Sequence, residues 1–202
     1  MIRLQEKNIN TPEEYGRIFE VRKEKETDEF DLRRWSELFS KYKGGMLLDL
    51  GCLDSGIVEL IPDKSKYFGL DISPLPIKEM GSKYPSATFV IGDLYDISLG
   101  QDLMDYVVIG EVLEHLEKPE EAIKEAARVL KSGGILAVSV PLEEAKEPGA
   151  VDGERHLWSF SEEDIKNLLS PYGEVEIKIL RSIKEPVYKY CWPQLIAWCK
   201  KG

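Results

Sequence analysis

The sequence predicts an α/β domain built on a mostly parallel sheet, and two observations support this fold class. Short apolar runs of strand length recur along the chain, with stretches of helical character between them. Four of these runs are also followed by a glycine or an acidic residue. Parallel strands ending in this way place polar groups along one edge of the sheet, where open α/β sheets bind ligands.

Length and composition indicate one globular domain spanning residues 1–202. Apolar residues make up 43% of the chain and charged residues 32%, as in water-soluble proteins. No apolar run approaches the roughly 20 residues that a membrane span needs, and the N-terminus does not resemble a signal peptide. The three cysteines (Cys52, Cys191 and Cys199) lack zinc-like spacing. We therefore expect a cytoplasmic protein without a membrane partner.

The charge balance argues against nucleic acid as a partner. Lysine and arginine number 27 against 37 acidic residues, which gives a formal net charge of −10. An acidic protein repels phosphate backbones unless a local basic patch compensates. The sequence offers the pair Arg33-Arg34 and scattered lysines, which are typical of solvated helix faces.

Two helices are expected before the first strand, within residues 1–44. Thr11 and Glu14 flank a proline in the form of a capping box, which predicts a helix from there to about residue 25. Asp31 is expected to cap the second helix. One apolar stripe of that helix, at positions i, i+3, i+4 and i+7, consists of Trp35, Leu38, Phe39 and Tyr42.

The rest of the chain is organised around the stretch from Met46 to Gly56. Its apolar first half predicts a buried strand of a parallel sheet. Gly51, Cys52 and Ser55 then allow a sharp turn that brings backbone N–H groups close to a ligand. A short helix follows and ends at Pro62. This strand, turn and helix are typical of a nucleotide-binding cradle, and a tight turn without a ligand is the alternative.

Three further strands precede polar residues. The second, within residues 66–72, ends at Asp71, about 20 residues after the first strand, where an acidic residue can accept hydrogen bonds from ribose hydroxyls. The third precedes Asp93, and the fourth is followed by Gly110 and Glu111.

The remaining elements complete an alternating pattern. Ser73 opens one helix, and Pro119 starts another whose apolar face is expected to cover the sheet. Residues 132–134 should break that helix before a fifth strand at 135–140. The connection 141–158 lacks periodicity, which predicts a functional loop. After it we expect a helix at 162–169 capped by Ser161, and two last strands at 175–180 and 195–200.

Taken together, five ordered motifs resemble those of class I S-adenosylmethionine (SAM) dependent methyltransferases, in the small-molecule branch that includes ubiquinone-biosynthesis and sugar methyltransferases. The motifs are LLDLGC, FGLDIS, IGDL, DYVVIGEVLEHLEKP and RVLKSGGILAVSVP. The resemblance implies a three-layer αβα Rossmann-like fold for residues 45–202, with a seven-stranded, mostly parallel sheet whose last strand is antiparallel. In this family the segment before the first strand often covers the active site, so residues 1–44 are either a substrate lid or helices packed on the sheet.

The resemblance also implies a cofactor, SAM, with S-adenosylhomocysteine (SAH) as product. The implied cofactor-binding residues are Asp49, Gly51, Cys52, Gly56, Asp71, Ile72, Asp93, Leu94 and Gly110. Asp49 and the glycines would approach the amino-acid part, Asp71 the ribose, and Asp93 the adenine. Helix capping by Asp71 and a turn role for Asp93 are the alternatives.

One residue departs from the family pattern. The first motif of the family usually reads Asp-x-Gly-x-Gly-x-Gly, and Leu53 occupies the second of these glycine positions. Either the loop bulges by one residue, or the methionine end of SAM is held differently.

Candidate catalytic residues follow the fourth strand. If the segment is helical, Glu111 and His115 share one face, with Glu114 adjacent. His115 is then a candidate general base, and His156 is its rival. For either histidine, a bond to a local backbone group is the structural alternative. Methyl transfer from a sulfonium needs orientation more than a nucleophile or metal, so we expect no metal site.

The expected function is methyl transfer to an oxygen or nitrogen of a small-molecule acceptor, by a monomer or homodimer. Two alternatives remain open. Glu111, Glu114, His115 and His156 also resemble the metal quartet of RNA 2′-O-methyltransferases that act on small-RNA 3′ ends. A SAM-binding module without turnover is the other alternative, prompted by Leu53.

Overall fold

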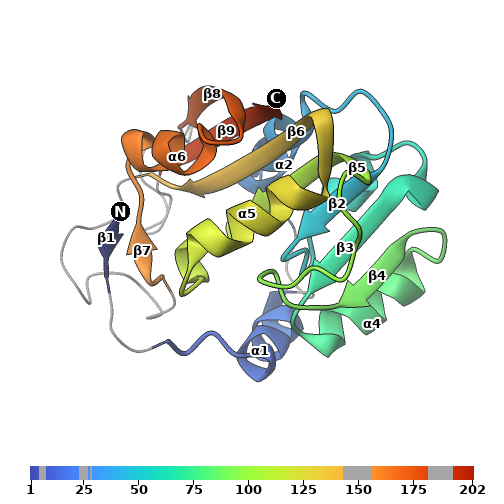
Figure 1. Cartoon of the computed structure of the whole chain (residues 1–202). Coiled ribbons are helices and arrows are strands. Elements are labelled where there is room, and N and C mark those ends of the chain that lie inside the picture. The colour runs from blue at the N-terminus through green and yellow to red at the C-terminus, as the bar shows by residue number, and fades with distance from the viewer. Residues whose placement is uncertain (5–7, 23–26, 28, 143–155, 182–192) are drawn as a thin grey trace.

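The structure is a computed structural model that describes residues 1–202 apart from 5–7, 23–26, 28, 143–155 and 182–192. Its centre is a seven-stranded sheet of order β4-β3-β2-β5-β6-β9-β8 (Figure 1). The strands are β2 (Leu47–Leu50), β3 (Tyr67–Asp71), β4 (Thr88–Ile91), β5 (Met104–Gly110), β6 (Leu130–Pro141), β8 (Gly173–Leu180) and β9 (Gln194–Lys201). β9 lies antiparallel between β6 and β8, whereas the pairs from β4 to β6 are parallel. The predicted fold class is confirmed.

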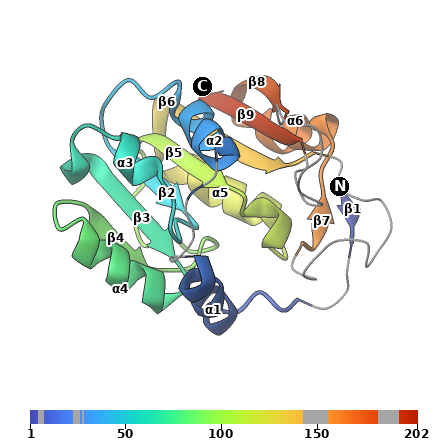
Figure 2. The same ribbon diagram turned by 180° about the vertical axis from the view of Figure 1, so that it is seen from behind.

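Helices cover both faces of the sheet. They are α1 (Pro12–Arg22), α2 (Glu29–Phe39), α3 (Ile57–Leu60), η1 (Lys64–Lys66), α4 (Pro74–Lys83), η2 (Leu113–His115), α5 (Pro119–Val129) and α6 (Glu162–Leu169). One core cluster joins α5 and α6 to the sheet, and a second joins α2, α3 and α4 to it. Figures 1 and 2 show α5 and α2 over opposite faces. Alternate residues of the central strands serve the two clusters: Leu48 and Val107 the first, Leu47 and Tyr106 the second.

Several helix starts agree with the sequence because the capping chemistry is local. Ser161 forms a capping box with Asp164 at the start of α6, and Ser73 is the N-cap of α4. Thr11 Oγ1 accepts a hydrogen bond from the backbone of Glu14 at 3.2 Å, as expected for the N-cap of α1.

Two predicted boundaries are wrong. Helix α2 begins at Glu29, so Asp31 lies inside its first turn and pairs with Arg34 at 2.6 Å instead of capping the helix. β6 begins at Leu130, immediately after α5, instead of at residue 135. The expected break at 132–134 is a strand irregularity in which Gly133 has φ +75°, and the pairing register between β5 and β6 shifts there.

A small second sheet was not predicted. β1 (Ile2–Arg3) pairs antiparallel with β7 (Trp158–Ser159), so the N-terminus lies beside the segment that follows His156 (Figure 1). Two-residue strands carry no readable periodicity. Most of the predicted functional loop, residues 143–155, lies outside the described residues. Within the described part of the chain, no helix has the length and apolar character that a bilayer span requires.

Candidate active site

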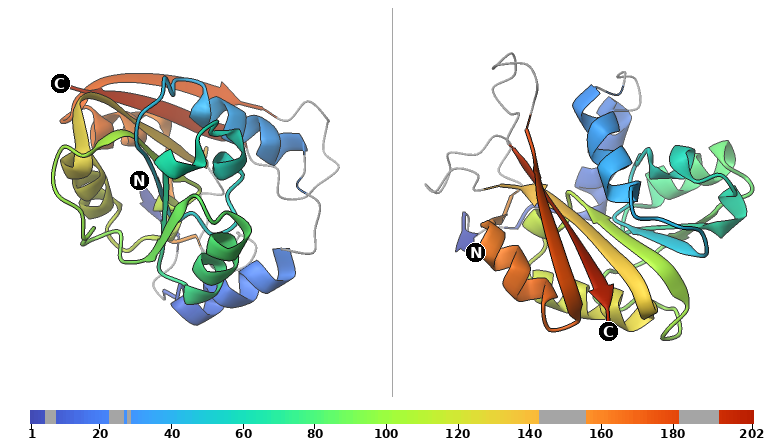
Figure 3. Two further views of the ribbon diagram at one scale, coloured as in Figure 1. Left: turned by 90° about the vertical axis from the view of Figure 1, so that its right-hand side faces the viewer. Right: turned by 90° about the horizontal axis from the view of Figure 1, so that it is seen from above.

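A cavity of about 360 Å³ lies at the carboxyl ends of β2, β3 and β5, beside α1 and α2. Figure 3 shows α1 and α2, in blue, from two further sides. Most of the predicted site residues line it: Asp49, Gly51, Cys52, Asp71, Ile72, Leu94, Gly110, Glu111, His115 and His156. Gly56 and Asp93 are not among the lining residues. The structure therefore brings the predicted cofactor end and the predicted acceptor end into one cavity.

The turn after β2 is fixed by backbone hydrogen bonds to β3. Gly51 and Cys52 both donate their N–H to the carbonyl of Leu70, at 2.8 and 3.1 Å. Gly51 has φ +73°, and a Cβ at this position would lie 2.5 Å from Val112. Glycine is thus required at position 51 for two reasons, its left-handed backbone and the close approach of the Val112 side chain.

Leu53, which replaces a family glycine, adopts a left-handed backbone with φ +33°. This conformation is costly for a residue with a Cβ, by about 1–2 kcal/mol. It is held by a hydrogen bond from the Leu53 N–H to Asp71 Oδ2 at 3.0 Å. The loop therefore uses leucine in a conformation that glycine adopts more easily.

Gly56 is needed for packing against α2. A Cβ on Gly56 would lie 2.2 Å from the ring of Trp35, which is 9% exposed. The ligand contact that the resemblance implies for Gly56 stays a prediction. The structure supplies a separate reason for glycine here, which is the close approach of the indole.

We expect Gly56→Ala to lower the free energy of unfolding by about 1–3 kcal/mol, because overpacking displaces the Trp35 ring. Urea denaturation measures the change. Gly81→Ala is a matched control: Gly81 lies within α4, and its added Cβ would have Phe89 as nearest neighbour at 4.0 Å. The control should leave stability unchanged or raise it by about 1 kcal/mol. Equal effects of the two substitutions would contradict the packing argument.

Two buried aspartates lie at the ends of β2 and β3. Asp49 is 3% exposed and accepts a hydrogen bond from the Tyr67 hydroxyl at 2.8 Å. Burial raises the pKa of Asp49 to about 6, although the Tyr67 hydrogen bond opposes the shift. Burial also raises the pKa of Asp71, whose oxygens accept hydrogen bonds from the N–H groups of Ser73 (2.8 Å) and Leu53 (3.0 Å).

Asp71 is placed where both roles that the sequence left open are possible, and its ribose role stays a prediction. It binds the amide of the N-cap residue of α4, and it lines the cavity. Each carboxylate oxygen can accept more than one hydrogen bond, so a ligand hydroxyl can be bound in addition. Ile72 is 39% exposed beside it. Asp93 accepts a hydrogen bond from the Tyr95 N–H at 2.9 Å, as a turn residue does, and its adenine role stays a prediction.

Glu111 is positioned by a residue that was expected on the surface. Arg34 is 8% exposed, and its guanidinium contacts Glu111 Oε2 at 3.0 Å and Asp31 Oδ1 at 2.6 Å. Gln194 also donates to Glu111 Oε2, at 3.3 Å. The expectation of a solvated Arg33-Arg34 face is wrong for Arg34. The apolar stripe of α2 gave a signal, because Arg34 lies four residues before the buried Leu38 and so shares its face of the helix.

The expected shared helical face of Glu111 and His115 is also wrong. Glu111 has φ +57°, and the helical turn η2 begins two residues later, at Leu113. A residue with left-handed backbone cannot continue a right-handed turn. Glu111 therefore lies apart from His115 and forms its ion pair with Arg34.

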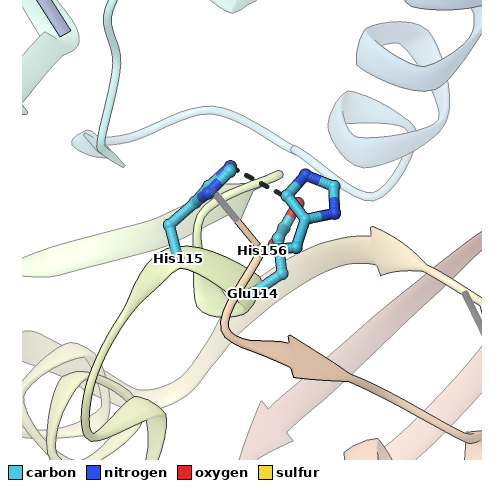
Figure 4. A group of neighbouring side chains, drawn as sticks. All are labelled: Glu114, His115 and His156. Carbon is cyan, nitrogen blue, oxygen red and sulfur yellow. Dashed lines mark ion pairs between the residues drawn. The ribbon is translucent and has the colours of Figure 1, made fainter. Parts of the chain in front are cut away.

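Three other polar side chains converge instead: Glu114, His115 and His156 (Figure 4). One ligand-type atom of each lies within 4.8 Å of the others. The two imidazole rings have centroids 4.7 Å apart, and His115 Nε2 is 4.0 Å from Glu114 Oε1. His156 reaches this position because the N–H of Leu157 donates to the carbonyl of Glu114 at 2.6 Å.

Comparison with known proteins is consistent with this geometry. A family model described as "Methyltransferase domain" matches residues 48–138. A demethylmenaquinone methyltransferase of Lysinibacillus sphaericus is 28% identical over 159 residues, covering 75% of this chain and 61% of the relative. A protein of Mycolicibacterium smegmatis named "Probable S-adenosylmethionine-dependent methyltransferase" is 29% identical over 116 residues, covering 57% of this chain and 45% of the relative. The chain spans about half the length of several curated relatives that it matches.

Solved structures share the fold. N-methyltransferase NodS of Bradyrhizobium japonicum, solved with S-adenosyl-L-homocysteine, superposes with a TM-score of 0.72 at 17% identity, over 93% of this chain and 98% of that one. A SAM-dependent methyltransferase of Thermotoga maritima superposes with a TM-score of 0.71 at 20% identity, over 94% of this chain and 95% of that one. At these identities the likeness establishes the fold.

Proposed function

We propose that this chain is a class I SAM-dependent methyltransferase, which transfers a methyl group from SAM to an oxygen or nitrogen of a small-molecule acceptor. The observation that carries the proposal is the cavity. It joins Asp71 and Leu94 at the predicted adenosine end to Asp49 at the predicted amino-acid end and to His115 at the predicted acceptor end. The family match over residues 48–138 supports the same assignment.

The residues at the cofactor end fit the parts of SAM. The Asp71 carboxylate would accept hydrogen bonds from the ribose hydroxyls, with the exposed Ile72 side chain beside the adenine. Asp49 would face the cationic amino-acid end, where a positive charge favours the ionised carboxylate. SAM supplies a methyl group that is already electrophilic. The task of this chain is then to orient the acceptor and exclude water.

A small-molecule acceptor fits the chain better than RNA does. The net charge of −10 disfavours a phosphate backbone. The cavity is enclosed partly by α1 and α2, which supply Tyr15, Ile18, Arg34, Trp35 and Leu38 to its lining. Curated and structural relatives that carry small-molecule names, such as the demethylmenaquinone methyltransferase, support the same class. His115, His156 and Glu111 stay predicted catalytic residues at this end.

The direct test is calorimetric titration of the purified protein with SAH, followed by a screen of metabolite acceptors with methyl-labelled SAM. We expect micromolar SAH binding and label transfer to a small molecule. Absence of SAH binding to folded protein would contradict the proposal. SAH binding without transfer to any acceptor would favour a binding module without turnover.

Asp71→Asn tests the cofactor end. We expect SAH affinity to fall by about 1–3 kcal/mol, roughly 5- to 150-fold, because ribose hydroxyls lose their charged acceptor. Asp63→Asn is a matched control, since Asp63 likewise accepts a hydrogen bond from the N–H two residues ahead, at 3.1 Å, and lies outside the cavity lining. Unchanged SAH affinity in a folded Asp71→Asn variant would contradict the ribose assignment.

A further inference from the structure

The cluster of Glu114, His115 and His156 combines a buried carboxylate with two imidazoles at the cavity wall. The three ligand-type atoms lie within 4.8 Å of one another, and all three residues line the cavity (Figure 4). Two of the residues are adjacent in η2, whereas His156 comes from the segment that leads into β7. The convergence is therefore a product of the tertiary fold.

Hydrogen bonds to backbone carbonyls hold the two segments together beside the cluster. The Leu157 N–H donates to the carbonyl of Glu114 at 2.6 Å, and Trp158 Nε1 donates to the carbonyl of Leu116 at 2.8 Å. A third hydrogen bond runs from Asn10 Nδ2 to the carbonyl of His115 at 3.1 Å. The side chains thus project from a pre-organised frame, which binding sites for ions require.

Burial favours positive charge beside Glu114. The Glu114 side chain is 1% exposed, and a carboxylate in such a place is stabilised by nearby positive charge. His115 Nε2 lies 4.0 Å from Glu114 Oε1. A dication between Glu114 and the two rings would add positive charge beside this buried carboxylate.

We propose that Glu114, His115 and His156 form a binding site for a divalent transition-metal ion of the Zn²⁺ or Mn²⁺ type. Two nitrogen donors and one carboxylate suit these ions, and three protein ligands leave a position open on the cavity side. Ligand bonds to zinc are about 2.0–2.1 Å long, so side-chain rotations that shorten the present separations by about 1–1.5 Å would complete the shell. Both imidazoles are partly exposed and line the cavity.

The site goes beyond the proposed methyl transfer and revises the expectation that no metal is used. As ligands, His115 and His156 would hold an ion that binds an acceptor oxygen in the cavity, in place of acting as free bases. Of the four residues in the metal quartet predicted as an alternative, the structure assembles three, because Glu111 is paired with Arg34.

The test measures metal binding directly, without SAM or acceptor. Chelator-stripped protein is titrated calorimetrically with ZnCl₂ and MnCl₂, and with MgCl₂ as a hard-cation comparison. We expect one saturable site for zinc or manganese and at least tenfold weaker binding of magnesium. Cobalt loading should give a visible ligand-field spectrum, and zinc should raise the melting temperature.

Matched variants assign the ion to the cluster. His156→Gln and Glu114→Gln should each weaken binding of zinc or manganese by at least tenfold and remove the zinc-dependent rise in melting temperature. Glu117→Gln is the control, because Glu117 lies three residues from Glu114 and pairs with Arg3 at 2.9 Å. This variant should bind metal as the wild type does. His156 is only half-buried, so His156→Gln keeps the test valid even if Glu114→Gln fails to fold.

Two outcomes would overturn the site. One is the lack of saturable binding of both zinc and manganese by folded wild-type protein. The other is binding that His156→Gln and a folded Glu114→Gln leave unchanged. SAH titration of the same stripped protein separates this result from the proposed function, because loss of the metal site leaves SAH binding in place.

Discussion

Replacing Arg34 with methionine is expected to lower the free energy of unfolding by about 3 kcal/mol. Removing one member of a buried ion pair typically costs about 3–5 kcal/mol, because the remaining charge stays buried without compensation. We expect the lower end of this range, because the Glu111 and Asp31 side chains are 25% and 28% exposed and water partly screens their charges. Methionine preserves most of the aliphatic volume. Urea denaturation measures the change, and the melting temperature should fall by about 6–12 °C.

Two further variants separate the ion pair from general damage to α2. Arg33→Met changes the neighbouring arginine, which makes an exposed hydrogen bond to the carbonyl of Arg181 at 3.4 Å, and should shift stability by at most about 0.5 kcal/mol. Glu111→Gln combined with Arg34→Met should recover part of the loss, because one of the two carboxylates that contact the Arg34 guanidinium is then neutral. If Arg34→Met lowers the free energy of unfolding no more than Arg33→Met does, the ion pair with Glu111 contributes little to stability.

The sheet and the cofactor end were predictable because they depend on local patterns. Apolar runs such as 47–50 have the length of buried strands, and parallel strands bring their carboxyl ends to one edge. Asp71 followed from its place at the end of the second strand, Asp49 was assigned through the family resemblance, and both line the cavity. The start of α4 follows from the proline at its first position, and that of α6 from the capping box of Ser161; both signals involve neighbours in sequence.

The acceptor end was predicted less well because it depends on contacts between distant segments. Glu111 and His115 have helical spacing in the sequence, yet the left-handed backbone of Glu111 separates them. Its partner Arg34 comes from α2, and no local rule connects the two. His156 was singled out as a lone histidine, and its meeting with Glu114 depends on the register between β7 and η2. Gly56 was attributed to ligand approach, whereas the structure adds the Trp35 ring as a reason for glycine.

The affinity for SAH is expected to rise with pH until about pH 7, through ionisation of Asp49. Burial raises the pKa of Asp49 to about 6 from a usual value of 3.8. A cationic amino group bound nearby favours the ionised carboxylate, so binding at pH 5 requires Asp49 to lose a proton first. Below the pKa, each pH unit then weakens binding by up to about tenfold, or 1.4 kcal/mol. Calorimetric titrations with SAH at pH 5, 6, 7 and 8 measure the profile.

The same shift has an opposite effect on the stability of the unliganded protein, which makes the assignment to Asp49 checkable. A raised pKa contributes stability that is fully present below the unfolded-state value and is lost as pH rises through about 6. The difference between the two pKa values corresponds to about 3 kcal/mol. Asp49→Asn keeps an acceptor for the Tyr67 hydroxyl and should flatten both profiles. Asp63→Asn, in which a carboxyl of lowered pKa outside the cavity lining is removed, should leave the SAH profile unchanged. A profile that persists in Asp49→Asn would move the titrating group to Asp71, whose pKa is also raised by burial.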